Sequence, residues 1–207
     1  MTASSRLFCL TTLALLTVGP AACSGEDGPG TGNENEVFTT ITLTLTPTAG
    51  GSPVVAVVDD PDGDGGKAPT VQPIALSPGM FDMSVKFENR LAKPPENLTE
   101  EVEDEATQHQ IFFTGNAVNG PASNAPGAPL THTYADMDSK GLPLGVVNRI
   151  TAAVGMGTLT VTLRHLPPIN DVPQKMAGLA DAVRMMGGFA GIAGSTDVQV
   201  TLPVRVQ

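Results

Sequence analysis

The segment GTLTVTLRH, residues 157–165, places an apolar side chain at every second position. Leu159, Val161 and Leu163 alternate with threonines, which is the pattern of a β-strand with one buried face. The same alternation recurs in three further segments, TTITLTLTPT (39–48), MFDMSVKFE (80–88) and TDVQVTLPVRV (196–206). These segments predict a fold built mainly from strands.

The rest of the chain supplies additional strands of less regular pattern. They are expected at 53–59, 70–76, 110–115, 131–136 and 146–154. Turn-rich segments containing Gly, Pro and Asn separate them. About eight or nine short strands with such spacing predict an all-β fold, an immunoglobulin-like β-sandwich with one or two short helical insertions.

The first helical insertion is expected within ENLTEEVEDEATQHQ, residues 96–110. Asn97 is a candidate N-cap, and acidic residues follow in the first turns, where the helix dipole favours them. Leu98, Val102 and Ala106 recur at a spacing of four residues and therefore form one apolar stripe.

The second helical insertion is expected within QKMAGLADAVRMMGG, residues 174–188, and would interrupt the connection between the last two strands. Met176, Leu179, Val183 and Met186 fall on one face of such a helix, and the following glycine, at position 187, would end it. We expect this face to pack over a sheet edge. A methionine surface for a soft metal or a partner is the alternative.

The first residues have the composition of an export signal. In residues 1–22 a single charge, Arg6, precedes a mostly apolar run that is too short to span a membrane as a helix. The sequence Ala21-Ala22-Cys23 resembles the lipobox of bacterial lipoproteins, which implies that Cys23 is lipidated. Ordinary cleavage before Cys23, leaving a free thiol, is the alternative.

A lipid at Cys23 would anchor the chain to a membrane. Residues 23–36 then form a tether, because beyond the cysteine they contain no large apolar side chain to offset the entropy of ordering. Residues 37–207 are expected to form a single domain. The expected location is the outer membrane or cell surface, with the periplasm as the alternative.

The overall charge limits the possible partners. The chain carries 21 Asp and Glu against 11 Lys and Arg, a net charge of −10. This balance argues against nucleic acid as a partner, because phosphate contacts require basic patches. With no Trp and a single Tyr, the chain is also poorly supplied with stacking surfaces for bases. A protein partner in the cell envelope remains compatible with the composition.

An acidic loop, DDPDGDGG at 59–66, is a candidate calcium site. Asp60, Asp62 and Asp64 stand at alternate positions and are followed by Gly65, and carboxylates spaced in this way can converge on one calcium ion. A solvated acidic turn is the alternative.

A second acidic loop contains Asp136 and Asp138, with Gly141 three residues further on. Lys140 stands where a further ligand would be expected, so this calcium site is the weaker of the two. Aspartate and glycine are also ordinary turn residues, which is the alternative interpretation.

A transition-metal site is the other candidate. Glu105 and His109 are separated by four residues, so they would share a face of the first helix. His165 has the inward parity of Leu159, Val161 and Leu163. Two histidines and a carboxylate suit zinc or copper. A histidine that is simply buried and hydrogen-bonded is the alternative.

Several segments together resemble a group of bacterial lipoproteins without an established activity. They are T-L-T-L-T-P-T near the start, D-P-D-G-D-G-G, the acidic helix ending in H-Q-I-F-F, Y-A-D-M-D-S-K-G-L-P-L-G, T-L-T-V-T-L-R-H and D-V-Q-V-T-L-P-V. Members are often labelled as a type 1 periplasmic-binding fold, which requires a longer chain of alternating strands and helices. The resemblance implies no catalytic residues.

These observations lead to two hypotheses of function. No G-x-S-x-G, H-E-x-x-H or phosphate-loop motif occurs, so we expect a non-enzymatic, envelope-anchored lipoprotein, stabilised by calcium, with a structural or partner-binding role. The alternative is a periplasmic protein that handles or depends on a transition metal through Glu105, His109 and His165.

Overall fold

The computed structural model of the chain describes residues 37–63 and 66–207. The expectations for the signal segment, for Cys23 and the tether, and for Asp64 therefore concern positions outside the described residues. The described residues belong to one compact unit. In the described part of the chain, no helix is long and apolar enough to cross a membrane.

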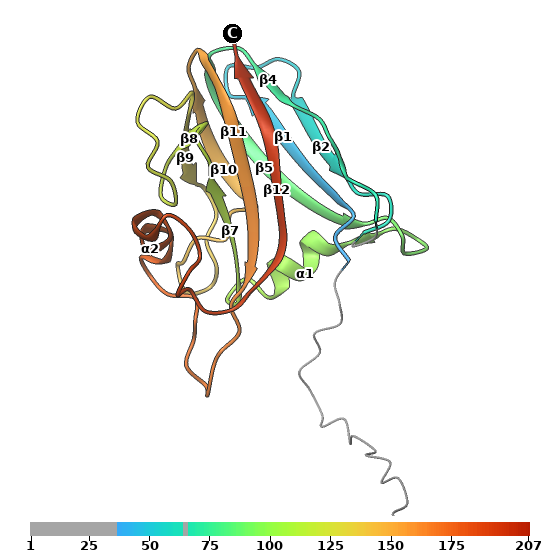
Figure 1. Cartoon of the computed structure of the whole chain (residues 1–207), viewed down its shortest axis with the longest axis vertical. Helices are drawn as coiled ribbons and strands as arrows, with labels where there is room; N and C mark the ends of the chain where they lie inside the picture. The colour runs from blue at the N-terminus through green and yellow to red at the C-terminus, as the bar shows by residue number, and fades with distance from the viewer. Residues whose placement is uncertain (1–36, 64–65) are drawn as a thin grey trace, which may run out of the picture. The chain divides into compact units, whose positions relative to one another are not determined.

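The described residues contain twelve strands and two helices, and the strands form two sheets (Figure 1). The large sheet has eight strands, in the order β3-β2-β1-β5-β10-β9-β8 with β6 paired to β5. Its members are β1 (Thr40–Pro47), β2 (Val54–Asp59), β3 (Thr70–Val71), β5 (Gly79–Asn89), β6 (Glu96–Asn97), β8 (Val118–Asn119), β9 (Leu130–Tyr134) and β10 (Val147–Ala152).

The small sheet has four strands, in the order β4-β12-β11-β7. Its members are β4 (Ile74–Leu76), β7 (His109–Thr114), β11 (Gly155–His165) and β12 (Ser195–Val206). β4 runs parallel to β12, whereas β11 is antiparallel to both of its neighbours. β11, which contains the segment GTLTVTLRH, is thus a central strand.

The core lies between the two sheets and confirms the prediction of an all-β sandwich. Leu159, Val161 and Leu163 are buried, as their alternation predicted. The structure has more strands than expected because some are very short. Residues 70–76, for example, divide into β3 and β4 at Pro73, which has no backbone N–H to donate to a ladder.

The first helix, α1 (Leu98–Asp104), is shorter than the predicted segment. Leu98 and Val102 are buried, as predicted. Asn97 occupies the N-cap position of α1, as predicted, but its side chain makes no capping hydrogen bond and its amide donates instead to the Glu100 carboxylate at 2.8 Å. The Thr99 hydroxyl accepts a hydrogen bond from the Phe87 backbone N–H at 2.8 Å, which fixes α1 to β5.

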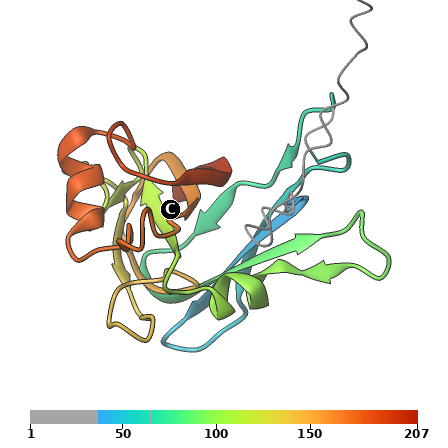
Figure 2. The ribbon, with the colours of Figure 1, turned by 90° about the horizontal axis from the view of Figure 1, so that it is seen from below.

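The second helix, α2 (Leu179–Met186), lies between β11 and β12 in the chain and ends at Gly187, as predicted. It lies on the side of the sandwich away from β2 (Figure 2). Leu179 and Val183 pack with Phe112 in a second apolar cluster.

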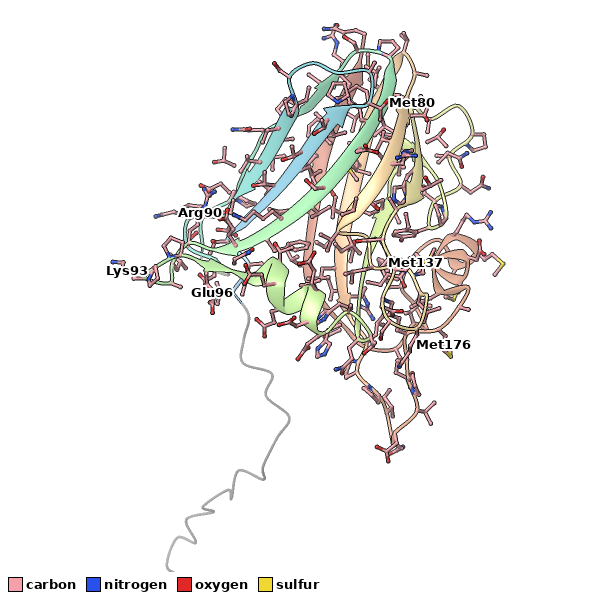
Figure 3. All side chains as sticks on the ribbon, turned by 180° about the vertical axis from the view of Figure 1, so that it is seen from behind. Met80, Arg90, Lys93, Glu96, Met137 and Met176 are labelled. Atoms are coloured by element: carbon pink, nitrogen blue, oxygen red, sulfur yellow. The ribbon has the colours of Figure 1, made fainter. Side chains whose placement is uncertain are left out.

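The prediction that methionines complete the buried face of α2 was wrong. Met176 and Met186 are 58% and 48% exposed. The helix begins only at Leu179, so Met176 precedes it and has no helical register. Figure 3 shows Met137 and Met176 on the same side of the molecule as α2.

Candidate metal centre

Two histidines lie side by side at one end of the small sheet. The pairing of β7 with β11 places His109 directly opposite His165. Their rings stack with centroids 4.7 Å apart and an interplanar angle of 15°. The sequence placed His165 on the inward face but carried no information on which strand would lie next to it.

Glu105 completes the cluster from the turn between α1 and β7. Among the described residues, ligand atoms of Glu105, His109 and His165 all lie within 4.8 Å of one another. The predicted grouping is therefore present, but the predicted reason was wrong. His109 is the first residue of β7, and α1 has already ended at Asp104. A turn closed by a hydrogen bond from the Gln108 N–H to the Glu105 carbonyl at 2.8 Å brings the two together.

The His109 ring is held neutral by its surroundings. Its side chain is 1% exposed, and Nδ1 is buried without a hydrogen-bond partner among the described residues. Burial, followed by the proximity of His165, lowers the pKa of His109 from 6.5 to about 4, although the nearby backbone carbonyl of Glu105 opposes the shift. At neutral pH the ring therefore carries a free nitrogen lone pair, which is the form that binds metal ions.

Asp197 is a second carboxylate at the cluster, and the sequence did not predict it there. Its Oδ2 lies 3.7 Å from His109 Nε2, and its side chain is only 14% exposed. Burial raises the pKa of Asp197 to about 6, although the neighbouring His165 and a hydrogen bond from Ser195 oppose the rise. Oδ2 is buried without a hydrogen-bond partner among the described residues.

A β-bulge explains why the sequence did not reveal Asp197. Strand alternation assigns it to the outer face, because the inward residues of β12 are Val198 and its even-numbered neighbours. In the structure Leu163 pairs with Val198 but Arg164 pairs with Thr196, so Asp197 is an extra residue in the ladder. An extra residue re-aims a side chain, which here reaches the histidine cluster.

Arg164 holds the backbone that leads into this bulge. Its guanidinium donates to the carbonyls of Ile192, Ala193 and Gly194 at 3.3, 2.9 and 2.8 Å, and to the Thr196 hydroxyl at 2.8 Å. Arginine suits this task because its planar donors reach several acceptors at once. The segment before Asp197 is therefore attached to β11 at several points.

A buried ion pair fastens the loop that follows His165. Lys175 Nζ lies 2.9 Å from Asp138 Oδ2, and both side chains are 0% exposed. Lys175 also donates to the Ala106 carbonyl at 2.7 Å, in the turn between Glu105 and His109. Lys175 thus connects the segment that follows His165 to the turn that precedes His109.

The aspartates of the second acidic loop are engaged by protein groups. Asp136 accepts hydrogen bonds from the Gly145 and Val147 N–H groups, each at 2.7 Å. Asp138 accepts from the Lys140 and Leu142 N–H groups at 2.8 and 2.9 Å and is paired with Lys175. The two carboxylates are accounted for as turn-forming groups, and we do not propose calcium here.

The first acidic loop is described only in part. Asp60 accepts a hydrogen bond from the Asp62 N–H at 3.4 Å, and Asp62 Oδ2 accepts from the Lys67 N–H at 3.2 Å. Asp62 Oδ1 is buried without a partner among the described residues. Because Asp64 lies outside the described residues, calcium binding by this loop stays a prediction.

The third histidine, His132, belongs to the core. Its Nε2 lies 2.9 Å from Asn148 Oδ1, while the Asn148 amide donates to the Gly145 carbonyl at 2.7 Å. The amide oxygen can only accept, so His132 is protonated on Nε2. Burial lowers the pKa of His132 to about 4.

Comparison of the chain with known protein families, with curated proteins and with solved structures found no match. The function of the chain is therefore inferred from the geometry and chemistry of the site.

Proposed function

We propose that this chain binds a transition-metal ion through Glu105, His109 and His165. The observation that carries the proposal is the convergence of their ligand atoms within 4.8 Å, from a turn and two neighbouring strands. A buried imidazole nitrogen without a partner supports it, because burying a polar atom unpaired costs free energy that a metal bond would offset.

The donor set indicates the class of metal. Two imidazoles and one carboxylate suit zinc or copper, whereas calcium and magnesium prefer oxygen ligands alone. Three protein ligands leave a further coordination position open. Such a position permits exchange of the metal or binding of a small ligand. We therefore propose metal binding or delivery, located at the cell envelope through the expected lipid anchor at Cys23.

The test is zinc binding by the full chain, measured by titration calorimetry and by metal analysis after dialysis. Wild type is expected to retain about one equivalent, and Glu105→Gln to bind at least about tenfold more weakly. Glu103→Gln is the matched control, because it removes the same charge from an exposed position of α1. Absence of zinc in wild type, or equal affinity in Glu105→Gln, would refute the assignment.

Calcium in the loop Asp60–Asp64 is a second candidate, favoured by the buried Oδ1 of Asp62, which has no partner among the described residues. In this case the ion would stabilise a loop and leave the histidines free. Asp62→Asn should then lower the melting temperature only in the presence of calcium. A calcium-independent effect would identify an acidic turn.

A further inference from the structure

We propose that Asp197 is a positioning residue that keeps the Nε2 nitrogen of His109 protonated and so directs the metal ion to Nδ1. The inference deepens the proposed function and rests on it. It concerns which of two chemically distinct nitrogens is the ligand.

The two nitrogens of His109 face two different carboxylates. Glu105 Oε2 lies 3.9 Å from Nδ1, and Asp197 Oδ2 lies 3.7 Å from Nε2. A neutral imidazole has one donor and one acceptor nitrogen, whereas an ionised carboxylate only accepts. The ring can therefore direct its single N–H at only one of the two acids.

Burial decides toward which of the two acids the N–H of the ring is directed. The Asp197 side chain is 14% exposed and its Oδ2 has no hydrogen-bond partner among the described residues, whereas Glu105 is 44% exposed and open to water. A buried acceptor without a donor costs more than an exposed one. Protonation of Nε2 directs the N–H of the ring at the buried acid, 3.7 Å away, and leaves the Nδ1 lone pair on the side of Glu105.

This arrangement matches the outer shell of known metal sites. A metal-bound histidine commonly donates its second N–H to a carboxylate, which fixes the tautomer and the ring orientation. In this chain the bulge at Asp197 supplies that carboxylate, and Arg164 secures the segment that precedes it. The bulge therefore both interrupts the pairing of β11 with β12 and places a carboxylate next to His109.

The first test reads the tautomer without any metal. Nitrogen NMR of the full chain with labelled histidine distinguishes a protonated ring nitrogen from an unprotonated one, and the chain has only three histidines to assign. For His109 we expect a protonated Nε2 and an unprotonated Nδ1 at neutral pH. Protonation of Nδ1 instead would overturn the proposal, whatever the metal affinity.

The second test combines a substitution with zinc binding. Asp197→Asn should weaken zinc binding by about 10–100-fold and shift His109 toward the other tautomer. Asp171→Asn is the matched control: it removes the same charge from an exposed loop position, with φ 63°, where asparagine is tolerated. The control should stay within about twofold of wild type, a margin far below the expected loss.

The outcomes separate this inference from the proposed function. Zinc bound at Nε2, or unchanged affinity in Asp197→Asn, would overturn the role of Asp197 while leaving the metal site intact. Absence of zinc binding by wild type would overturn the metal site. Unfolding of Asp197→Asn would not remove the test, because the tautomer is read from the wild-type protein.

Discussion

Replacement of Lys175 by methionine is expected to lower the free energy of unfolding by about 3–5 kcal/mol. The substitution keeps an apolar stem of similar length but removes the cation that lies 2.9 Å from Asp138. Both side chains are 0% exposed, so the remaining carboxylate stays buried without its counter-charge.

Other contacts of Lys175 and Asp138 change the expected loss in the free energy of unfolding. The Ala106 carbonyl loses the donor at 2.7 Å, which adds about 1 kcal/mol to the loss. Asp138 retains the N–H groups of Lys140 and Leu142 as partners, and these offset part of the cost of its isolated charge. Adding Asp138→Asn to Lys175→Met should recover part of the stability, because no uncompensated charge then remains.

The chain offers a control ion pair with a nearly identical N–O distance. Lys86 Nζ lies 2.8 Å from Glu88 Oε1, but the two side chains are 51% and 17% exposed. Lys86→Met should therefore cost less than about 1 kcal/mol, because water screens the pair. Urea unfolding of wild type and the two variants at neutral pH measures the difference. Equal losses in Lys86→Met and Lys175→Met would refute the argument that burial makes the Lys175 ion pair important.

The remaining predictions concern pH and backbone packing. The pKa of His132 is about 4 in the folded protein, against 6.5 for an exposed histidine in the unfolded chain. As the pH falls, the unfolded chain therefore binds a proton at His132 before the folded protein does. This histidine should therefore cost up to about 3 kcal/mol of stability between about pH 6.5 and pH 4, and urea unfolding of His132→Phe should show a weaker pH dependence. Gly194→Ala should destabilise by more than about 2 kcal/mol and weaken zinc binding, because a Cβ there would collide with the His165 carbonyl. Gly178→Ala, also at positive φ but with nothing within 4 Å, should cost about 1 kcal/mol, and similar losses in both alanine variants would contradict the collision.

Much of the fold was accessible from the chain alone, because period-two alternation reports burial directly. β1, β5, β11 and β12 were predicted from alternating residues such as Leu159 and Val161, and the core confirms them. The boundaries of the helices were less accurate. α1 ends before His109 because the chain enters β7 there, a consequence of pairing with β11 that no local propensity records.

Part of the candidate site was likewise predictable from the sequence, and part was not. The candidate ligands Glu105, His109 and His165 were recognised by their chemistry and parity. Their meeting depended on the pairing of β7 with β11, which joins residues far apart in the chain. Asp197 was not recognised, because a bulge reverses the parity that its position in β12 predicts.

The sequence by itself determined the buried faces of the regularly alternating strands, the acidic net charge and the candidate metal ligands, because these depend on side-chain chemistry and on the spacing of near neighbours. Tertiary structure decided which strands are adjacent, where the ladder takes an extra residue and which polar groups are buried in pairs. Lys175 and Asp138 illustrate the reason: their ion pair exists only after two loops have packed together. Contacts of this kind depend on the whole chain, since they form only when the rest of the fold has excluded water.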